Sequence, residues 1–313
     1  MGRAKILVIR GGAIGDFILT LPAIAALRRH FPNAELEVLG YPKIASLALQ
    51  SKLLDNVRHI ESRQLAGFFA SRGDLAEDLC DYFSGFNIII SYLYDPDEIF
   101  RANIARCSTA QFIQGPHRPN EGEQFHAAKV FLKPLERLAI FDAHCVPELR
   151  LRSINGGLAN TLALHPGSGS ESKNWPESQW KELLKMLVTA TGLNFLLVGG
   201  EAEGGLLNRL ASGLPSGRIQ VAQNLPLTEL ADRIHNCTAF VGHDSGITHM
   251  AAALGLPCLV LWSHTEQSIW QPLGERIAIL RGPNGLQTLA VARVADELMG
   301  ICSSSSTASR QSS

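Results

Sequence analysis

The sequence contains few charged side chains, and those present nearly balance. Charged residues make up 18% of the 313 residues, and the formal net charge at pH 7 is −1. Proteins that bind nucleic acid usually carry a basic excess, so this composition argues against a nucleic-acid partner. The hydrophobic fraction of 46% is sufficient for well-developed cores, and the length suits two domains.

Three further patterns are missing. The six cysteines contain no Cys-x-x-Cys pair, which is more typical of reduced thiols than of a disulfide framework or a zinc site. No apolar run reaches the ~18 residues of a membrane-spanning helix. The first residues show no apolar segment followed by a small-residue cleavage site. We therefore expect a cytoplasmic protein that can still touch a membrane surface.

Short β-branched segments alternate with amphipathic ones, a rhythm typical of parallel sheets covered by helices. In the first half, strands are expected at residues 5–10, 35–40, 56–60, 87–91 and 110–114, with helices at 16–30, 42–50 and 75–84. In the second half, strands are expected at 161–165, 194–198, 219–222, 239–243 and 258–261, with helices at 177–191, 203–212, 227–235 and 246–254. The sequence therefore predicts an α/β protein with two Rossmann-like units.

The rhythm weakens between about residues 115 and 157, where four prolines and a closing Asn-Gly-Gly occur. We place the domain boundary at the end of this stretch, giving domains of residues 1–157 and 158–302. Residues 303–313 are rich in serine, cannot form a core and are expected to be disordered. The stretch 115–157 has no motif to which a role can be assigned. Ligands in open α/β sheets bind beyond the carboxyl ends of strands, so the strand-to-helix turns are the candidate sites.

The first such turn is residues 11–16 (GGAIGD). A dinucleotide-binding fingerprint would need Gly-x-Gly-x-x-Gly here and an acidic residue after the second strand, and neither is present. Gly12 and Gly15 would allow another molecule to approach the backbone, and Asp16 places a carboxylate at the helix start. Asp16 can be a helix N-cap or a general base that takes the proton of an attacking hydroxyl. Spacing alone favours the cap.

The second turn is residues 165–176 (HPGSGSESKNWP). Around Ser168 and Gly169 the small side chains expose backbone N–H groups, and Lys173 adds a compact positive charge. This combination suits a diphosphate. A flexible loop with a solvated lysine explains it equally well, and no Gly-Lys-Ser/Thr follows that would make it a Walker A loop.

The third turn places Glu201 directly after two glycines. Its carboxylate can accept hydrogen bonds from ribose hydroxyls or a base amine, or it can simply favour the dipole of the next helix.

The fourth turn is residues 243–249 (HDSGITH). Ser245, Gly246 and Thr248 lie in the first turn of the expected helix, where unpaired N–H groups and the dipole favour an anion. Asp244, itself an anion, should point away from a phosphate and toward sugar hydroxyls. Helix capping and a buried histidine are the alternative explanation. Two histidines, a carboxylate, a serine and a threonine within seven residues are more than a cap requires, so we interpret this loop as a binding site.

These motifs resemble those of bacterial ADP-heptose:lipopolysaccharide heptosyltransferases and their relatives in glycosyltransferase family nine, which have the GT-B fold. The similar segments are residues 15–23 (GDFILTLPA), 165–176, 199–201 and 244–255 (DSGITHMAAALG), in the order expected for the family. The resemblance implies two Rossmann-like domains, each with a parallel sheet flanked by helices, facing across a cleft. The first would bind the acceptor and the second the nucleotide-sugar.

The resemblance also implies an inverting transfer without a metal or another cofactor. Heptose would move from ADP-heptose to a lipopolysaccharide-core-type acceptor, lipid-linked or saccharide, with peripheral contact to the inner face of the cytoplasmic membrane. Asp16 matches the family's proposed base. The positions that match the sugar-donor site are Ser168, Gly169, Lys173, Glu201, Asp244, Ser245, Gly246 and His249, and Thr248 lies in the same loop.

His243 and Ile247 depart from the residues that relatives often carry, which leaves the sugar and the acceptor open. Two alternatives keep the fold and change the function. One is a nucleotide-sugar epimerase or hydrolase, and the other is a non-catalytic homologue that binds a nucleotide-sugar.

Overall fold

The computed structural model describes residues 3–151, 158 and 160–308. The chain divides into two compact units, Met1–Pro147 and Glu148–Ser313. The predicted boundary at residue 157 falls outside the described residues. Each unit contains one parallel sheet with helices against it, which confirms the predicted α/β class.

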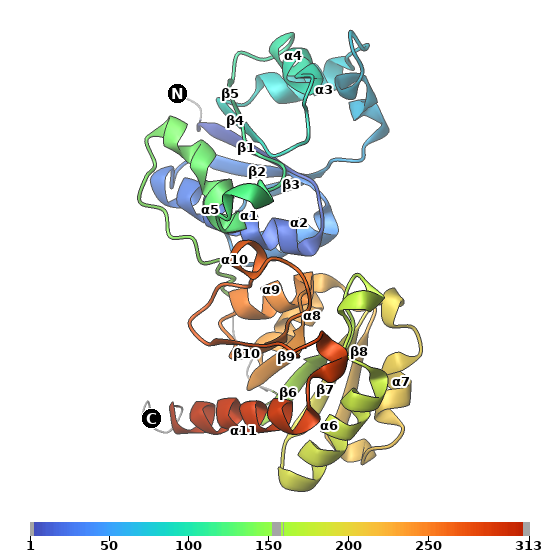
Figure 1. Ribbon diagram of the computed structural model, residues 1–313. Helices are drawn as coiled ribbons and strands as arrows, with labels where there is room; N and C mark the ends of the chain where they lie inside the picture. The colour runs from blue at the N-terminus through green and yellow to red at the C-terminus, as the bar shows by residue number, and fades with distance from the viewer. Residues whose placement is uncertain (1–2, 152–157, 159, 309–313) are drawn as a thin grey trace. The chain divides into compact units, whose positions relative to one another are not determined.

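The first unit holds a five-stranded sheet in the order β3-β2-β1-β4-β5 (Figure 1). Each strand pairs in parallel with its neighbours. The chain extends the sheet first to one side of β1 and then to the other, so the switch point lies between β1 and β4. This is the place where such sheets bind ligands. The strands are β1 (Lys5–Arg10), β2 (Glu35–Gly40), β3 (Asn56–His59), β4 (Ile88–Ser91) and β5 (Gln111–Gln114).

Helices cover both faces of this sheet. On one side α1 (Ile14–His30) packs against α2 (Pro42–Gln50) and α5 (Ala127–Leu132). Many of the residues of α1 are buried, as expected for a helix with neighbours on several sides. The other face is covered by α3 (Glu77–Ser84), α4 (Ile99–Ala105) and the 3₁₀ segment Arg63–Phe69, around an aromatic core.

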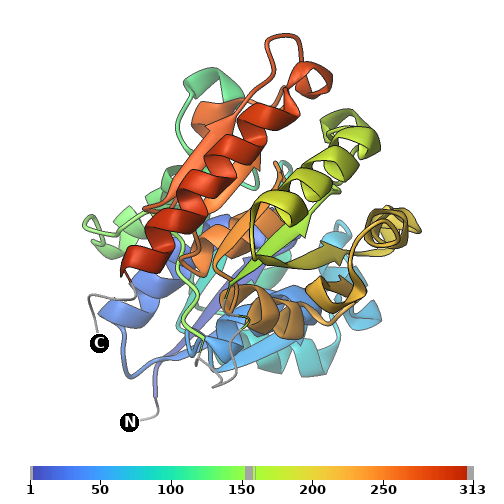
Figure 2. The ribbon, with the colours of Figure 1, turned by 90° about the horizontal axis from the view of Figure 1, so that it is seen from below.

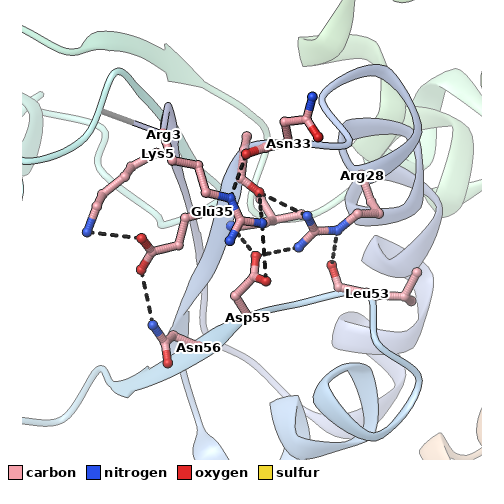
Figure 3. A network of polar contacts seen from close by, with 10 residues as sticks. Arg3, Lys5, Arg28, Asn33, Glu35, Leu53, Asp55 and Asn56 are labelled. Atoms are coloured by element: carbon pink, nitrogen blue, oxygen red, sulfur yellow. Dashed lines mark hydrogen bonds and ion pairs between the residues drawn. The ribbon is translucent and has the colours of Figure 1, made fainter. Parts of the chain in front are cut away.

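A network of charged side chains holds the amino ends of the strands in this unit (Figure 3). One carboxylate oxygen of Asp55 accepts hydrogen bonds from Arg28 at 2.5 Å and from the backbone N–H of Leu36 at 2.8 Å. The other lies 3.5 Å from the guanidinium of Arg3. Burial alone would raise the pKa of Asp55, but these hydrogen bonds and charges outweigh it and lower the pKa. Asp55 directly precedes β3, so it ties α1, β2 and β3 together.

The second unit holds a six-stranded parallel sheet in the order β11-β10-β9-β6-β7-β8. Its switch point lies between β6 and β9. Helices α6, α7 and α11 share one hydrophobic core on one face, and α6 and α11 run side by side (Figure 2). The strands are β6 (Thr161–His165), β7 (Asn194–Gly199), β8 (Ile219–Gln223), β9 (Ala239–His243), β10 (Cys258–Leu261) and β11 (Ile277–Leu280). The helices are α6 (Glu177–Ala190), α7 (Leu206–Ala211), α8 (Leu227–His235), α9 (Gly246–Ala253), α10 (Gln267–Trp270) and α11 (Val291–Ala308).

The structure differs from the sequence-based expectation mainly in the segments without a motif. Within the stretch 115–157, α5 and the 3₁₀ segment Lys133–Leu138 form, and Pro134 lies in the first turn of that segment, where no N–H is needed. The tail expected to be disordered from residue 303 is helical as far as Ala308, because an existing helix gains one backbone bond for each residue added. Residues 309–313 lie outside the described ranges. Among the helices described, none is long and apolar enough to cross a membrane.

Candidate active site

Two loops of the second unit meet at the switch point between β6 and β9. The two strands pair with His165 opposite Gly242, so the loops that follow them start side by side. The ammonium of Lys173, from the first loop, lies 2.8 Å from a carboxylate oxygen of Asp244, from the second. The side chain of Asp244 is 9% exposed and that of Lys173 is 26% exposed, so water screens the pair only partly. The structure therefore joins two of the residues predicted to bind the ligand.

The start of α9 is organised by Ser245. Its hydroxyl accepts the backbone N–H of Thr248 at 3.3 Å, which makes Ser245 the N-cap. The same hydroxyl lies 3.1 Å from the hydroxyl of Thr248 and 3.3 Å from Nδ1 of His165. Thr248 is fully buried and donates its hydroxyl to the carbonyl of His243. The side chain of Thr248 therefore stabilises the loop from its buried side.

Exposure separates the residues predicted in this loop into two groups. Asp244, Ser245 and Gly246 are half-buried and lie where the loop becomes the helix, whereas His249, like Thr248, is buried within α9. Of the two groups, only the first is partly exposed to solvent.

The loop after β6 contains a tight turn next to a cavity. The hydroxyl of Ser168 donates to the carbonyl of Ser170 at 2.7 Å and accepts its N–H at 3.2 Å. Gly169 is exposed, and a Cβ there would meet no atom within 4 Å. The cavity beside this turn measures about 470 Å³ and is lined by loop residues together with Glu203 and Arg209. That volume falls in the range of small-molecule sites.

Glu203, two residues after the predicted Glu201, lines this cavity together with Glu171 and Glu177. Glu201 is exposed, whereas the side chain of Glu203 is 6% exposed. Glu203 accepts the backbone N–H of Gly200 at 2.5 Å, and a side chain at Gly167 would overlap its carboxylate. The signal in the sequence was its spacing. A carboxylate three residues after Gly200 can turn back to cap that N–H.

Two buried histidines lie at the ends of these strands. Burial lowers the pKa of His165 and of His243 to about 4 in each case, so both are neutral at pH 7. The 3.8 Å separation between His165 and Glu203 is therefore a polar contact and not an ion pair at that pH. Across the described part of the chain, no group of three or more His, Cys, Asp and Glu side chains is arranged to hold a metal ion.

In the first unit, Asp16 lies at the carboxyl end of β1, beside the switch point of that sheet. One carboxylate oxygen accepts the N–H of Ala13 at 3.0 Å, and the other lies 3.6 Å from the guanidinium of Arg10. The helix begins at Ile14, earlier than expected, so Asp16 is its third residue and not its N-cap. It still caps an N–H group, but with one oxygen only. The side chain is 28% exposed, and the second oxygen is free of that capping bond.

The backbone next to Asp16 requires glycine. Gly12 has a φ of +96°, and a Cβ at this position would lie 2.8 Å from a carboxylate oxygen of Asp16. Gly15 lies in the first turn of α1 and is half-buried. The absence of a side chain at Gly12 therefore leaves room for the carboxylate of Asp16.

Arg10 is not among the residues predicted from the sequence. Its side chain is 3% exposed, and it donates hydrogen bonds to the carbonyls of His117 at 2.9 Å and of Asp16 at 3.3 Å. The guanidinium also lies 4.4 Å from the centre of the Phe131 ring. Burial lowers the pKa of Arg10, although the charge of Asp16 opposes this. A buried arginine beside a half-exposed carboxylate could have been suspected from its position, since Arg10 is the last residue of a hydrophobic strand.

In fold the chain matches solved heptosyltransferases, which belong to the glycosyltransferases with the GT-B fold. Within that class, the chain is similar to the heptosyltransferases of family 9. The sequence model of glycosyltransferase family 9 (heptosyltransferase) matches residues 150–294, which fall in the second unit.

Individual relatives extend the similarity to most of the chain. Lipopolysaccharide heptosyltransferase 3 of Escherichia coli is 21% identical over 291 residues, covering 82% of this chain and 83% of its own length. Lipooligosaccharide heptosyltransferase 2 of Haemophilus influenzae is 32% identical over 114 residues, and this match spans 35% of the chain and 33% of that relative. The structure of E. coli heptosyltransferase WaaC with ADP has a TM-score of 0.76 at 18% identity, covering 95% of this chain and 99% of that chain. At this identity the structural similarity establishes the fold alone.

Proposed function

We propose that the protein is an inverting, metal-independent glycosyltransferase that takes its sugar from a nucleotide-sugar. The observation that carries the proposal is the Lys173–Asp244 contact, which joins two loops at the switch point of the second sheet. Such a switch point is where doubly wound sheets bind nucleotides. The diphosphate would lie over the start of α9, against its unpaired N–H groups and near Lys173. Asp244 would accept hydrogen bonds from sugar hydroxyls.

The sugar donor that we propose is ADP-heptose. Its support is the similarity to family 9 and to a heptosyltransferase whose structure was solved with ADP. The cavity lined by Ser168, Gly169 and Glu203 has room for part of the nucleoside. The buried carboxylate of Glu203 is better placed than that of the exposed Glu201 to accept ribose hydroxyls in that cavity.

Asp16 is the proposed general base. The acceptor hydroxyl would attack the anomeric carbon while its proton passes to Asp16, and the bond from that carbon to the phosphate oxygen would break. Attack from the face opposite the leaving group inverts the anomeric centre. The nucleoside diphosphate would leave with the electron pair, stabilised by Lys173 and by the N–H groups at the start of α9. In this scheme Lys173 and the N–H groups at the start of α9 stabilise the negative charge of the leaving group, so no metal ion is needed for that purpose.

The acceptor that we propose is a lipopolysaccharide-core-type saccharide, free or lipid-linked, met at the inner face of the cytoplasmic membrane. The names of the relatives support this class of acceptor. In the first unit, Tyr94 is 70% exposed and its ring lies 4.6 Å from that of His117. His117 supplies the carbonyl that Arg10 binds, so this aromatic pair lies near Asp16. An exposed ring with one apolar face suits a sugar ring.

The deciding experiment compares wild type with Asp16→Asn in a transfer assay that contains ADP-heptose and a core saccharide lacking heptose. The introduced amide keeps a side-chain oxygen for the N–H of Ala13 but cannot take a proton. Turnover should fall by roughly 10²- to 10⁴-fold while donor binding persists. A third reaction omits the acceptor. Release of free sugar or of a new isomer there at the full rate would indicate a hydrolase or an epimerase instead.

A further inference from the structure

His243 occupies a position that the proposed reaction does not use. It is the last residue of β9 and is fully buried. Its ring lies 5.6 Å from that of Trp180 in an edge-on arrangement. A buried histidine within hydrophobic surroundings needs partners for both ring nitrogens, since leaving either unpaired is costly.

Both partners come from the loop that follows β6. Nε2 of His243 accepts the backbone N–H of Trp175 at 2.8 Å. Nδ1 lies 3.1 Å from the carbonyl of Gly167. An N–H group can only donate and a carbonyl can only accept, so Nδ1 carries the proton and Nε2 does not. The two partners lie near opposite ends of the loop, and one ring therefore fixes both ends.

The backbone of His243 holds the other loop. Its carbonyl accepts the hydroxyl of Thr248, and this hydroxyl lies 3.1 Å from the hydroxyl of Ser245, the N-cap of α9. One residue is thus bonded through its side chain to the loop that carries Lys173 and through its backbone to the loop that carries Asp244.

We propose that His243 is a positioning residue that sets the spacing of the two loops that bind the diphosphate of the sugar donor. This inference rests on the proposed function and adds a residue that does not touch the substrate. The Lys173–Asp244 pair closes the same two loops from the partly exposed side, and His243 closes them from the buried side. Removing His243 would let Gly167 and Trp175 move away from the start of α9.

The neutral form of the ring is the one that makes both bonds. An imidazolium carries a proton on each nitrogen and could not accept the N–H of Trp175. Burial lowers the pKa of His243 to about 4, which keeps the required form at neutral pH.

The test compares two variants of His243 with a control in the same strand. His243→Gln can keep one of the two bonds, and His243→Leu removes both. Val241→Ala, also in β9 and fully buried, loses core packing without a bond to either loop. The measurements are the melting temperature, the dissociation constant of ADP by calorimetry, and KM and kcat for the nucleotide-sugar.

His243→Leu should raise the ADP dissociation constant and the donor KM by about tenfold. A change of this size is expected if the displaced loops lose about one hydrogen bond to the ligand. His243→Gln should give a smaller rise, and kcat at saturating donor should change by less than about threefold. Val241→Ala should lower the melting temperature and leave the ADP dissociation constant unchanged.

If a folded His243→Leu or His243→Gln binds ADP as tightly as wild type, the inference is wrong. Should His243→Leu fail to fold, His243→Gln decides alone. If wild type binds no nucleoside diphosphate, the proposed function is wrong and the inference that rests on it falls as well. If every variant binds ADP as tightly as wild type, the role of His243 is wrong but the proposed function is not affected.

Discussion

The guanidinium of Arg10 lies 3.6 Å from the carboxylate of Asp16, with the arginine almost completely buried and the aspartate partly exposed. The arginine approaches from the protein interior, where it also binds the carbonyl of His117. The carboxylate is therefore held on its inner side by a positive charge and by the N–H of Ala13. Its outer side is partly exposed to solvent.

We expect Arg10→Met to lower kcat by at least about tenfold, because the carboxylate loses its charged neighbour and its fixed position. The carbonyl of His117 also loses its hydrogen bond, so the free energy of unfolding should fall by about 1–3 kcal/mol. Arg10→Lys keeps the charge, and its kcat should lie between those of wild type and Arg10→Met. Steady-state kinetics and denaturant unfolding measure both effects.

The control is Lys5→Met, at the other end of β1, where the lysine pairs with Glu35 at 3.1 Å. It removes a partly exposed cation from the same strand and should leave kcat unchanged. Equal loss of kcat in both variants would mean that the charge near Asp16 has no special role.

The Lys173–Asp244 pair gives a second prediction. Lys173→Met should raise the donor KM by about tenfold or more, because a positive charge near the diphosphate is lost. Asp244→Asn should also weaken donor binding, and the two effects should not be additive, since the residues are in contact. A double-mutant cycle on the ADP dissociation constant measures the coupling.

Lys181→Met is the matched control for that cycle. Lys181 pairs with Glu177 at 2.7 Å, but its side chain is 43% exposed and lies on α6. Exposed ion pairs contribute little, so the donor KM should not change. Additive effects of Lys173→Met and Asp244→Asn would contradict a shared role.

Glu203 and Glu201 are distinguished by a pair of matching substitutions. Glu203→Gln should raise the donor KM by about five- to fiftyfold, because the carboxylate near the cavity no longer accepts charge-assisted hydrogen bonds. Glu201→Gln, at an exposed carboxylate two residues earlier, should have little effect. A larger rise in donor KM for Glu201→Gln than for Glu203→Gln would instead identify Glu201 as the residue that contacts the donor.

The buried histidines predict how stability depends on pH. His165 and His243 have folded-state pKa values of about 4 against a usual value of 6.5. Between these pH values the unfolded chain binds more protons than the folded chain. The free energy of unfolding should therefore fall as the pH drops from 6.5 to 4, by on the order of 1–3 kcal/mol for each histidine.

Thermal unfolding across this pH range checks the sign. His243→Gln removes one of the two groups and should flatten the dependence, whereas His264→Gln, at an exposed position, should not. Stability that is constant or rises on acidification would contradict the neutral, buried state of both rings.

The regular part of the fold could be predicted because its signals are local. Hydrophobic strands and amphipathic helices gave most bounds to within a few residues, as for β2, α2, β6, α8 and β9. The strand β11 was missed because an edge strand of four residues carries little pattern. The helix α5 was missed because the prolines around it suggested a linker.

The candidate site could be predicted only where a motif carries its own chemistry. Lys173 and Asp244 were identified from separate turns, but their contact depends on the order of β6 and β9 in the sheet. Arg10 and His243 were not assigned roles because each is buried at a strand end, where sequence alone does not say which neighbours it meets. Glu201 was predicted without Glu203, because spacing does not show which of two nearby carboxylates is the buried one.

The carboxylate of Asp55 contacts two arginines and a backbone N–H at the amino ends of the strands in the first unit. Asp16, in contrast, lies beyond the carboxyl end of β1. The two ends of one sheet should thus respond differently to random mutagenesis. Substitutions around Asp55 should reduce the amount of folded protein in a cell while leaving the specific activity of the remainder unchanged. Substitutions of Asp16 itself, whose side chain is partly exposed, should do the reverse. Abundance and activity measured in one library would therefore separate the two positions.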